Sequence, residues 1–332
     1  MASQHIYHLD PRLPSQFVNA MLNNSKIHIA CLSLPPTAAQ LPYMLNTAQL
    51  CIMGVLTTLA TISLILYVEE VVYFAKKVRC PVKRRTNLWS SAAPTLIAVF
   101  SCLGLWIPRS AMYIDLIINT YFAVCFYLIL MVFIEGFGGK DAIVKKFEST
   151  DVHINTGPCC CCCLCLRPIR LTKKNVNLLV LGVFQLAFLK PVFNIIGVIL
   201  FADGIYNVED LSSKSIALWM NVSLGFSTVI ALWPIGILFR HAKAHLKDYN
   251  VGKKYAIFQL LLILTTVQSS IINIVGSSGV LPCVPPYSFR ARGFMMNSQL
   301  LIIETFLLSV LARFAYRKKD DEAGYIFKPL AV

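Results

Sequence analysis

Residues 111–135 read AMYIDLIINTYFAVCFYLILMVFIE, and the only charged side chains in this run, Asp115 and Glu135, stand near its two ends. An α-helix rises about 1.5 Å per residue, so about 20 mostly apolar residues cross the hydrocarbon core of a bilayer, which is about 30 Å thick. The run is therefore long and apolar enough to form a transmembrane helix. The fold depends on how often such runs recur.

Apolar runs recur along most of the 332-residue chain, of which 57% is hydrophobic and 14% charged. A soluble domain carries about 25% charged residues. The mean hydropathy of +0.66 also indicates a membrane protein. We therefore predict an all-α membrane protein built as a bundle of seven transmembrane helices. The predicted spans are roughly 48–72, 91–107, 111–135, 176–202, 215–239, 256–276 and 297–315.

The boundary between the second and third spans rests on three residues, Pro108, Arg109 and Ser110. A single helix through both apolar runs would be far longer than a bilayer requires. We therefore expect these three residues to form a tight hairpin on the outer side.

The distribution of basic residues predicts the orientation of the bundle. Four segments hold 22 of the 30 Lys and Arg residues: 75–90, 136–175, 240–255 and 316–332. With seven spans these segments fall on one side, which the positive-inside rule places in the cytosol. The N-terminus, with the segment 1–47, is then outside, and the C-terminus is cytosolic. Topology thereby explains the net charge of +14 without a nucleic acid partner, and some attraction to anionic membrane lipids is expected.

Three residues are candidates for covalent modification on the predicted outer side. Asn23 begins the sequence Asn-Asn-Ser, which matches the acceptor pattern for an N-linked glycan. Cys31 and Cys283 are the only cysteines predicted on that side, where oxidising conditions favour a disulfide between them. Two free thiols are the alternative.

The predicted cytosolic loop 136–175 contains a dense run of cysteines. A disulfide is disfavoured in the reducing cytosol, and a zinc site would need paired cysteines with a second half-site. Juxtamembrane cysteines of this kind suit S-palmitoylation, which would hold the loop against the inner leaflet. A metal site and an unmodified run are the alternatives. The predicted acylation sites are Cys159, Cys160, Cys161, Cys162, Cys163 and Cys165.

Polar side chains inside the spans are the candidate binding residues. A charge near the bilayer centre costs about 2.5–3.5 kcal/mol on insertion scales, so it usually has a role. Lys190 and Glu304 lie near the middle of the fourth and seventh spans, and Gln185, Asn194 and Gln268 add neutral polar groups. One interpretation is an interhelical pair of Lys190 with Glu304 that fixes packing. The other is a lining for an anionic, amphipathic solute.

No catalytic set is evident in the sequence. There is no H-E-x-x-H motif, no nucleotide-binding loop and no serine–histidine–aspartate arrangement. The stretch Gly136-Phe137-Gly138-Gly139-Lys140 lacks the context of a phosphate loop and is expected to end the third helix. We therefore predict that the chain is not an enzyme and has no cofactor or metal ion.

Seven spans with an outside N-terminus suggest a G-protein-coupled receptor, but the third span ends in Glu135-Gly136-Phe137 and the seventh lacks N-P-x-x-Y. The chain instead resembles the organic solute transporter alpha family. The match departs at the extreme termini and in the length of the cysteine run. The stretches that carry the resemblance run through most of the chain: Pro35–Leu41, Trp106–Ser110, Glu135–Lys140, Gly157–Cys163, Asp203–Tyr206 and Pro285–Ser288.

The resemblance implies a facilitated carrier for bile acids, steroid sulfates and similar anionic lipids. It further implies that the alpha subunit works only with a single-span beta subunit, at the basolateral plasma membrane of epithelia. A higher oligomer is left open. The competing hypothesis is a seven-span receptor or scaffold without transport activity.

Overall fold

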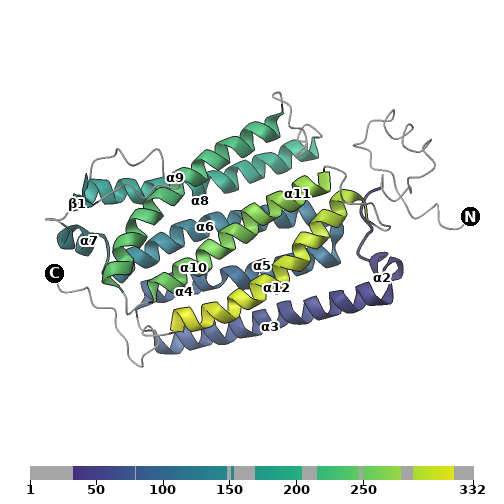
Figure 1. The fold of residues 1–332 in the computed structure, drawn as a ribbon, viewed down its shortest axis with the longest axis horizontal. Helices are drawn as coiled ribbons and strands as arrows, with labels where there is room; N and C mark the ends of the chain where they lie inside the picture. Colours follow the sequence, from purple (N-terminus) through teal and green to yellow (C-terminus); the bar gives the residue numbers. More distant parts are fainter. Residues whose placement is uncertain are drawn as a thin grey trace, which may run out of the picture. The chain divides into compact units, whose positions relative to one another are not determined.

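The computed structural model describes residues 33–78, 80–147, 151–152, 169–203, 215–246, 250–277 and 287–317 (Figure 1). These residues are almost all helical. The short elements are α2 (Leu41–Met44), α4 (Pro81–Ser91), η3 (Pro108–Ser110), α7 (Lys140–Lys146), η5 (Ile263–Gln268) and α11 (Ser269–Ser277). The longer helices are α3 (Thr47–Lys77), α5 (Ala93–Trp106), α6 (Ala111–Gly136), α8 (Lys173–Ala202), α9 (Ile216–His245), α10 (Val251–Leu262) and α12 (Phe289–Arg317). Strands β1 (Asp151–Val152) and β2 (Ile169–Arg170) pair antiparallel.

Seven helical stretches of the described residues are long and apolar enough to cross a membrane. This confirms the predicted helical class and number of candidate spans, whereas the orientation of the termini stays a prediction. The helices run past several of the apolar runs, since α3 continues to Lys77 and α9 to His245. The seven stretches are Thr47–Lys77, Pro81–Trp106, Pro108–Gly136, Lys173–Ala202, Ile216–His245, Val251–Ile272 and Ala291–Arg317.

The second and third spans are separated by one turn of 3₁₀ helix. Ile107 leaves the helical region, with φ −125° and ψ 74°, because the residue before a proline is disfavoured in the α conformation. The Ser110 N–H and hydroxyl both donate to the Ile107 carbonyl, at 2.9 Å and 2.7 Å. The chain then enters α6 at Ala111.

Glycines end α6, as the sequence predicts. Gly138 and Gly139 have φ of 99° and 101°, a region that favours glycine because a side chain there would be strained. The Gly139 N–H donates to the Ile134 carbonyl at 3.0 Å, which satisfies one of the last carbonyls of the helix.

The second membrane-spanning stretch begins with a polar helix that an apolar window does not detect. α4 has the sequence PVKRRTNLWSS, yet Lys83, Thr86, Asn87 and Ser91 are buried in it. Ala92, which joins α4 to α5, keeps a helical backbone with φ −66° and ψ −22°. The helical stretch therefore starts at Pro81, well before the predicted span 91–107.

The chain divides into two compact units, and several helices contribute residues to both. Unit 1 comprises Met1–Leu64, Thr95–Ile118 and Leu261–Leu307, and unit 2 comprises Ile65–Pro94, Asn119–Leu260 and Leu308–Val332. Each unit has its own core among the described residues.

The core of unit 1 is mainly aliphatic. Residues of α2, α3, α5 and α12 form one cluster that includes Leu41, Leu56, Leu105 and Ile302. Gly104 allows close packing, since a Cβ at this position would lie 2.9 Å from the Phe294 ring. Two polar contacts flank the cluster: Trp106 Nε1 donates to Thr57 Oγ1 at 3.0 Å, and Arg109 Nε donates to the Pro35 carbonyl at 2.9 Å. Tyr287 also packs here, and burial raises its pKa to about 12.

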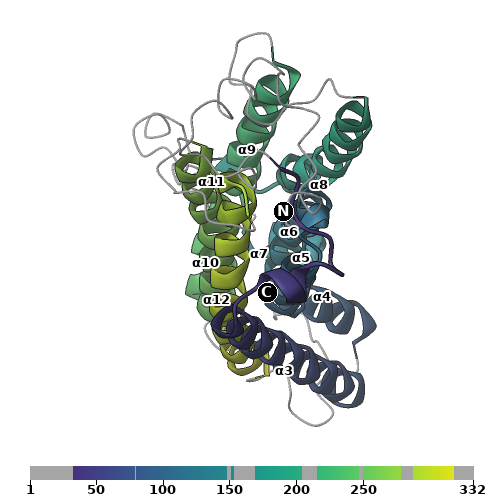
Figure 2. The same ribbon diagram turned by 90° about the vertical axis from the view of Figure 1, so that its right-hand side faces the viewer.

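The core of unit 2 is rich in aromatic residues. Phe122, Phe126 and Phe258 contact one another with ring centroids 5.0–5.6 Å apart. α8 and α9 lie side by side, as Figures 1 and 2 both show. Gly182 of α8 faces Pro234 of α9, because a Cβ at this glycine would lie 3.4 Å from the proline ring. α8 begins at a capping residue, Thr172, whose hydroxyl accepts from the Asn175 N–H at 3.3 Å.

Candidate functional site

Lys190 and Asn194 form a polar pair on α8. They lie one helical turn apart, so their side chains share a face of the helix. Both are partly buried, and Asn194 Nδ2 donates to Thr120 Oγ1 of α6 at 2.6 Å. Pro191 lies inside α8 between them and leaves the carbonyl one turn earlier without its usual donor. This pair puts an ammonium group and an amide within a membrane-spanning helix of unit 2.

Gln185, also on α8, makes a contact between helices. Its Nε2 donates to the carbonyl of Ser227 of α9 at 3.0 Å. Ser227 is buried where the two helices pack. The amide donor of Gln185 is thus bound by a backbone acceptor, which favours a role in packing α8 against α9.

Gln268 and Glu304 form a second polar pair, in unit 1. Gln268 Nε2 donates to Glu304 Oε2 of α12 at 3.0 Å. Gln268 is the last residue of η5, a π-helical segment, and such segments occur frequently at functional sites. The next residue, Ser269, exchanges hydrogen bonds of 3.0 Å and 3.2 Å with the side chain of Asn297. The π-helical segment is thus joined to α12 by two neighbouring polar contacts.

The five candidate residues therefore fall into two groups. Lys190, Asn194 and Gln185 belong to unit 2, and Gln268 and Glu304 belong to unit 1. Glu304 has a hydrogen-bond donor within its own unit. The pairing of Lys190 with Glu304 would join residues of different units and stays a prediction.

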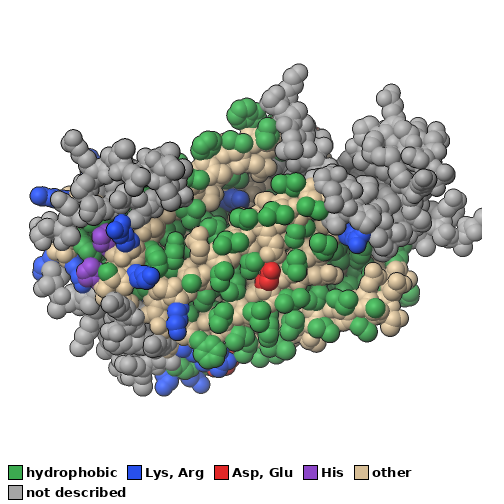
Figure 3. Space-filling model, viewed as in Figure 1, with side chains coloured by type: hydrophobic (Ala, Val, Ile, Leu, Met, Phe, Trp, Pro, Cys, Tyr) green, Lys and Arg blue, Asp and Glu red, His purple; other side chains and the backbone are tan. Residues whose placement is uncertain are grey.

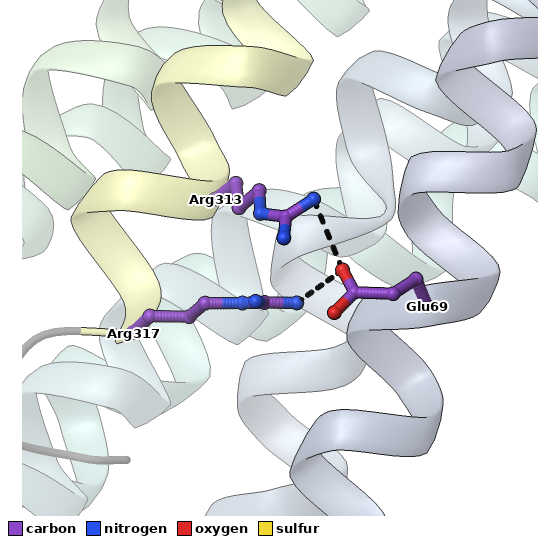
Figure 4. Close-up of polar contacts among 3 residues, drawn as sticks. All are labelled: Glu69, Arg313 and Arg317. Carbon is purple, nitrogen blue, oxygen red and sulfur yellow. Dashed lines mark hydrogen bonds and ion pairs between the residues drawn. The ribbon is translucent and has the colours of Figure 1, made fainter.

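A cluster of charged residues that the sequence interpretation did not identify lies in unit 2. Glu69 of α3 accepts a hydrogen bond from Arg317 at 2.6 Å and forms an ion pair with Arg313 at 3.1 Å, both on α12 (Figure 4). The Arg317 guanidinium also lies over the Tyr73 ring, 4.2 Å from its centroid. The two arginines are four residues apart and therefore share a face of the helix. This spacing could have indicated a common carboxylate partner.

Two carboxylates near the ends of spans, Glu70 and Glu135, are withdrawn from water. Only 4% of Glu70 is exposed. Glu135 is partly buried and accepts from Thr86 Oγ1 of α4 at 2.9 Å. In both places the polar helix α4 supplies a hydroxyl group, Thr86 to Glu135 and Ser91 to Glu70, and these hydrogen bonds lower the cost of burying the carboxylates.

A small polar cavity of about 10 Å³ lies among α4, α6 and α10 in unit 2. Its walls include Lys83, Asn87, Glu135 and Lys254, and Asn87 is only 2% exposed. This volume holds about one water molecule. The cavity is therefore too small for an organic solute.

Several predicted sites lie outside the described residues. They are Asn23, Cys31, Cys283 and the cysteines 159–163 and 165. The predicted glycan, disulfide and acylation therefore stay predictions. Within the described part of the chain, no three or more His, Cys, Asp or Glu side chains gather as metal ligands.

Comparison with known proteins identifies the family. The family described as Organic solute transporter Ostalpha matches residues 52–321, which is most of the chain. The chain belongs to the organic solute transporter alpha family. It is therefore a multi-pass membrane transporter, as the resemblance predicted, and the alpha designation implies a partner subunit.

Relatives in the organic solute transporter alpha family match nearly the whole chain. The organic solute transporter subunit alpha of Homo sapiens is 48% identical over 317 residues, covering 96% of this chain and 93% of that protein. The subunit alpha of Leucoraja erinaceus is 44% identical over 305 residues, covering 92% and 87%. A transmembrane protein 184 homolog of Dictyostelium discoideum is 25% identical over 228 residues, covering 68% and 44%. No solved structure matches the chain.

Proposed function

We propose that this chain is the alpha subunit of a heteromeric facilitated transporter for bile acids, steroid sulfates and similar anionic amphipaths. The observation that carries the proposal is the Lys190–Asn194 pair within a membrane-spanning helix of a solute transporter. An ammonium group placed there is costly unless it has a role. Binding the anionic end of a solute is such a role.

The chemistry of the pair fits an anionic amphipath. Lysine offers three N–H donors, and hydrogen bonds to charged groups are stronger than neutral ones. Only 17% of the most apolar part of α8 is buried. Most of that helix is therefore open to lipid, solute or a partner subunit. An apolar side chain on the same face of α8, such as the partly buried Phe193 three residues from Lys190, would contact a steroid skeleton while Lys190 and Asn194 bind its anionic group.

The remaining predicted site residues have hydrogen bonds that suggest packing. Gln185 binds a carbonyl of α9, and Gln268 binds Glu304. A carboxylate also repels an anion. We propose that these three residues stabilise their own units and that Lys190 and Asn194 contact the solute.

The partner, orientation and location belong to the same proposal. We infer a single-span beta subunit as the partner, a C-terminus in the cytosol and an N-terminus outside. The support is the concentration of basic residues in alternate connecting segments. The location is the plasma membrane, on the basolateral side of epithelial cells, and flux follows the electrochemical gradient of the solute.

Co-expression tests this proposal. The chain together with a single-span beta subunit should carry taurocholate and estrone sulfate in both directions, and either subunit alone should not. Flux that is unaffected by omitting the partner would contradict the heteromeric carrier. Ligand-dependent cytosolic signalling with no flux would identify the receptor or scaffold instead.

A further inference from the structure

A groove of about 960 Å³ lies in unit 2 where α9 ends and α10 begins. It is separate from the Lys190–Asn194 pair, and no residue of that pair lines it. Small-molecule sites have volumes of about 300–1,000 Å³, so the groove is large enough for a steroid-sized ligand. The described residues that shape it include Phe239, Arg240, Lys243, Ala244, Lys253 and Tyr255.

The charge of the groove is positive. Arg240 and Lys243 of α9 and Lys253 of α10 are exposed and line it, and its described lining has no Asp or Glu. Figure 3 shows Lys, Arg and His side chains gathered over the end of α9 and the start of α10, with hydrophobic side chains over most of the rest of that face. A cavity lined by one sign of charge concentrates ligands of the opposite sign.

The floor of the groove is aromatic and apolar. The rings of Phe239 and Tyr255 are stacked, with centroids 3.8 Å apart and planes at 21°. Both residues line the groove, together with Ala244, Leu246 and Val251. The same groove therefore offers an apolar surface and cations, which is the pattern that an anionic amphipath requires.

The start of α10 adds to this preference for anions. Val251 and Gly252 are the first residues of this 12-residue helix, and both line the groove. The helix dipole places partial positive charge at this end, where the Lys253 N–H already donates to the Asn250 carbonyl at 2.9 Å. Gly252 leaves space beside the backbone, since a Cβ there would meet no atom within 4 Å.

We propose that the α9–α10 groove is a second binding site for the transported solute, an amphipath with a sulfate, sulfonate or carboxylate group on a rigid apolar skeleton. The cations and the first turn of α10 hold the anionic group, and Phe239 and Tyr255 contact the skeleton. This inference rests on the proposed function, because it takes the transported anion as the ligand.

The apolar floor favours the solute over an anionic phospholipid. The headgroup of a phospholipid is polar throughout, and its tails stay in the bilayer. A headgroup in the groove would therefore bind the cations, but the aromatic floor would have no apolar partner. A steroid anion matches both.

Protection of an introduced cysteine tests the groove directly. Ala244 is small and exposed, so Ala244→Cys should accept a charged maleimide when the complex with the beta subunit is held in nanodiscs of neutral lipid, which leave both faces accessible. Mass spectrometry of the labelled peptide separates this thiol from native cysteines. We expect estrone sulfate at ten times its dissociation constant to slow labelling about tenfold, since that concentration occupies about nine-tenths of the sites.

A matched cysteine serves as the control. Val82 of α4 is 58% exposed and lies outside the groove. Labelling of Val82→Cys should be unaffected by estrone sulfate. Equal protection of both cysteines would show a general effect on the protein and would overturn the proposal.

Removal of the cations completes the test. The triple substitution R240Q/K243Q/K253Q in the Ala244→Cys chain should raise the estrone sulfate concentration needed for half-protection about 3- to 150-fold, since exposed ion pairs contribute about 0.2–1 kcal/mol each. The control K76Q/K145Q/K174Q removes the same charge from exposed lysines elsewhere and should leave protection unchanged.

Two further results would overturn the inference. One is a labelling rate at Ala244→Cys that estrone sulfate does not change. The other is protection by nanodiscs containing phosphatidylserine in place of the solute, which would identify a lipid site. Flux measured on the same complex separates the two proposals: flux without protection removes only the groove, and absence of flux removes the proposed function.

Discussion

The polar pair of unit 1 and that of unit 2 both lie within membrane-spanning helices, and they differ in charge and in how they are bound. In unit 1 the Glu304 carboxylate accepts from Gln268 at 3.0 Å. In unit 2 Asn194 is held by Thr120 at 2.6 Å, one turn from the Lys190 ammonium. The acidic pair is bonded within itself, whereas the basic pair adds the three N–H donors of the Lys190 ammonium to an amide that is bound by Thr120. On this basis we propose packing for the first pair and solute binding, led by Lys190, for the second.

The substitution expected to have the largest effect is Lys190→Gln. A hydrogen bond to a charged group contributes about 1.5–3 kcal/mol, so kcat/KM for estrone sulfate should fall about 10- to 100-fold. Uptake at equal surface expression measures this. Lys190→Arg keeps the charge and should retain more of the flux. If Lys190→Gln leaves the apparent affinity for estrone sulfate and the rate of uptake unchanged, the two pairs do not differ in function.

Substitutions in the ion-pair cluster of Glu69, Arg313 and Arg317 test whether removing any charge from a span lowers transport. Arg317→Gln removes an ion pair and the contact with the Tyr73 ring, and should lower the free energy of unfolding by about 1–2 kcal/mol. Arg313→Gln removes only the 3.1 Å contact and should cost less. Thermal melts of the purified complex would rank the two. Flux per folded complex should persist in both, and its loss to the extent seen for Lys190→Gln would contradict a specific role for that lysine.

Substitutions of Glu304 are expected to have the smallest effect on flux and stability, and they discriminate best between packing and solute binding. Glu304→Gln keeps an acceptor for Gln268, so both stability and estrone sulfate flux should stay close to those of the unsubstituted chain. Glu304→Leu removes the acceptor and should cost about 0.6 kcal/mol of stability, the average for polar contacts between membrane helices. Differential scanning fluorimetry would compare them. A large loss of flux in Glu304→Gln would move this carboxylate from packing to solute binding.

Much of the helical architecture was predictable because lipid imposes one simple requirement, about 20 apolar residues for each span. Residues 111–135 are the clearest example, and the structure has a helix from Ala111 to Gly136. The sequence did not predict that α4 belongs to the second span, because polar residues such as Lys83 and Asn87 are buried in it. Buried polar residues do not raise the hydropathy of a sequence window. The π-helical turn at Ile263–Gln268 likewise has no recognised pattern in the sequence.

The candidate residues were predictable and their contacts were not. Lys190 and Glu304 stand out in any hydropathy profile because a charge there is rare. The partner of each polar group depends on how helices distant in sequence pack, so the bond of Glu304 to Gln268 and the bond of Asn194 to Thr120 could not be predicted. The Glu69 cluster was missed for the same reason, although Arg313 and Arg317 share a helix face.

The most direct test of an uncoupled carrier for anions is the dependence of solute accumulation on membrane potential. One elementary charge gains about 2.3 kcal/mol per 100 mV, so a monovalent anion should accumulate about tenfold for each 60 mV, inside positive. Proteoliposomes containing this chain and its beta subunit, with the potential set by a potassium gradient and valinomycin, would measure the final ratio of estrone sulfate. An uncoupled heteromeric carrier should give this slope when the partner is present and no flux when it is absent. A final ratio of estrone sulfate that does not change with the membrane potential would contradict an uncoupled carrier.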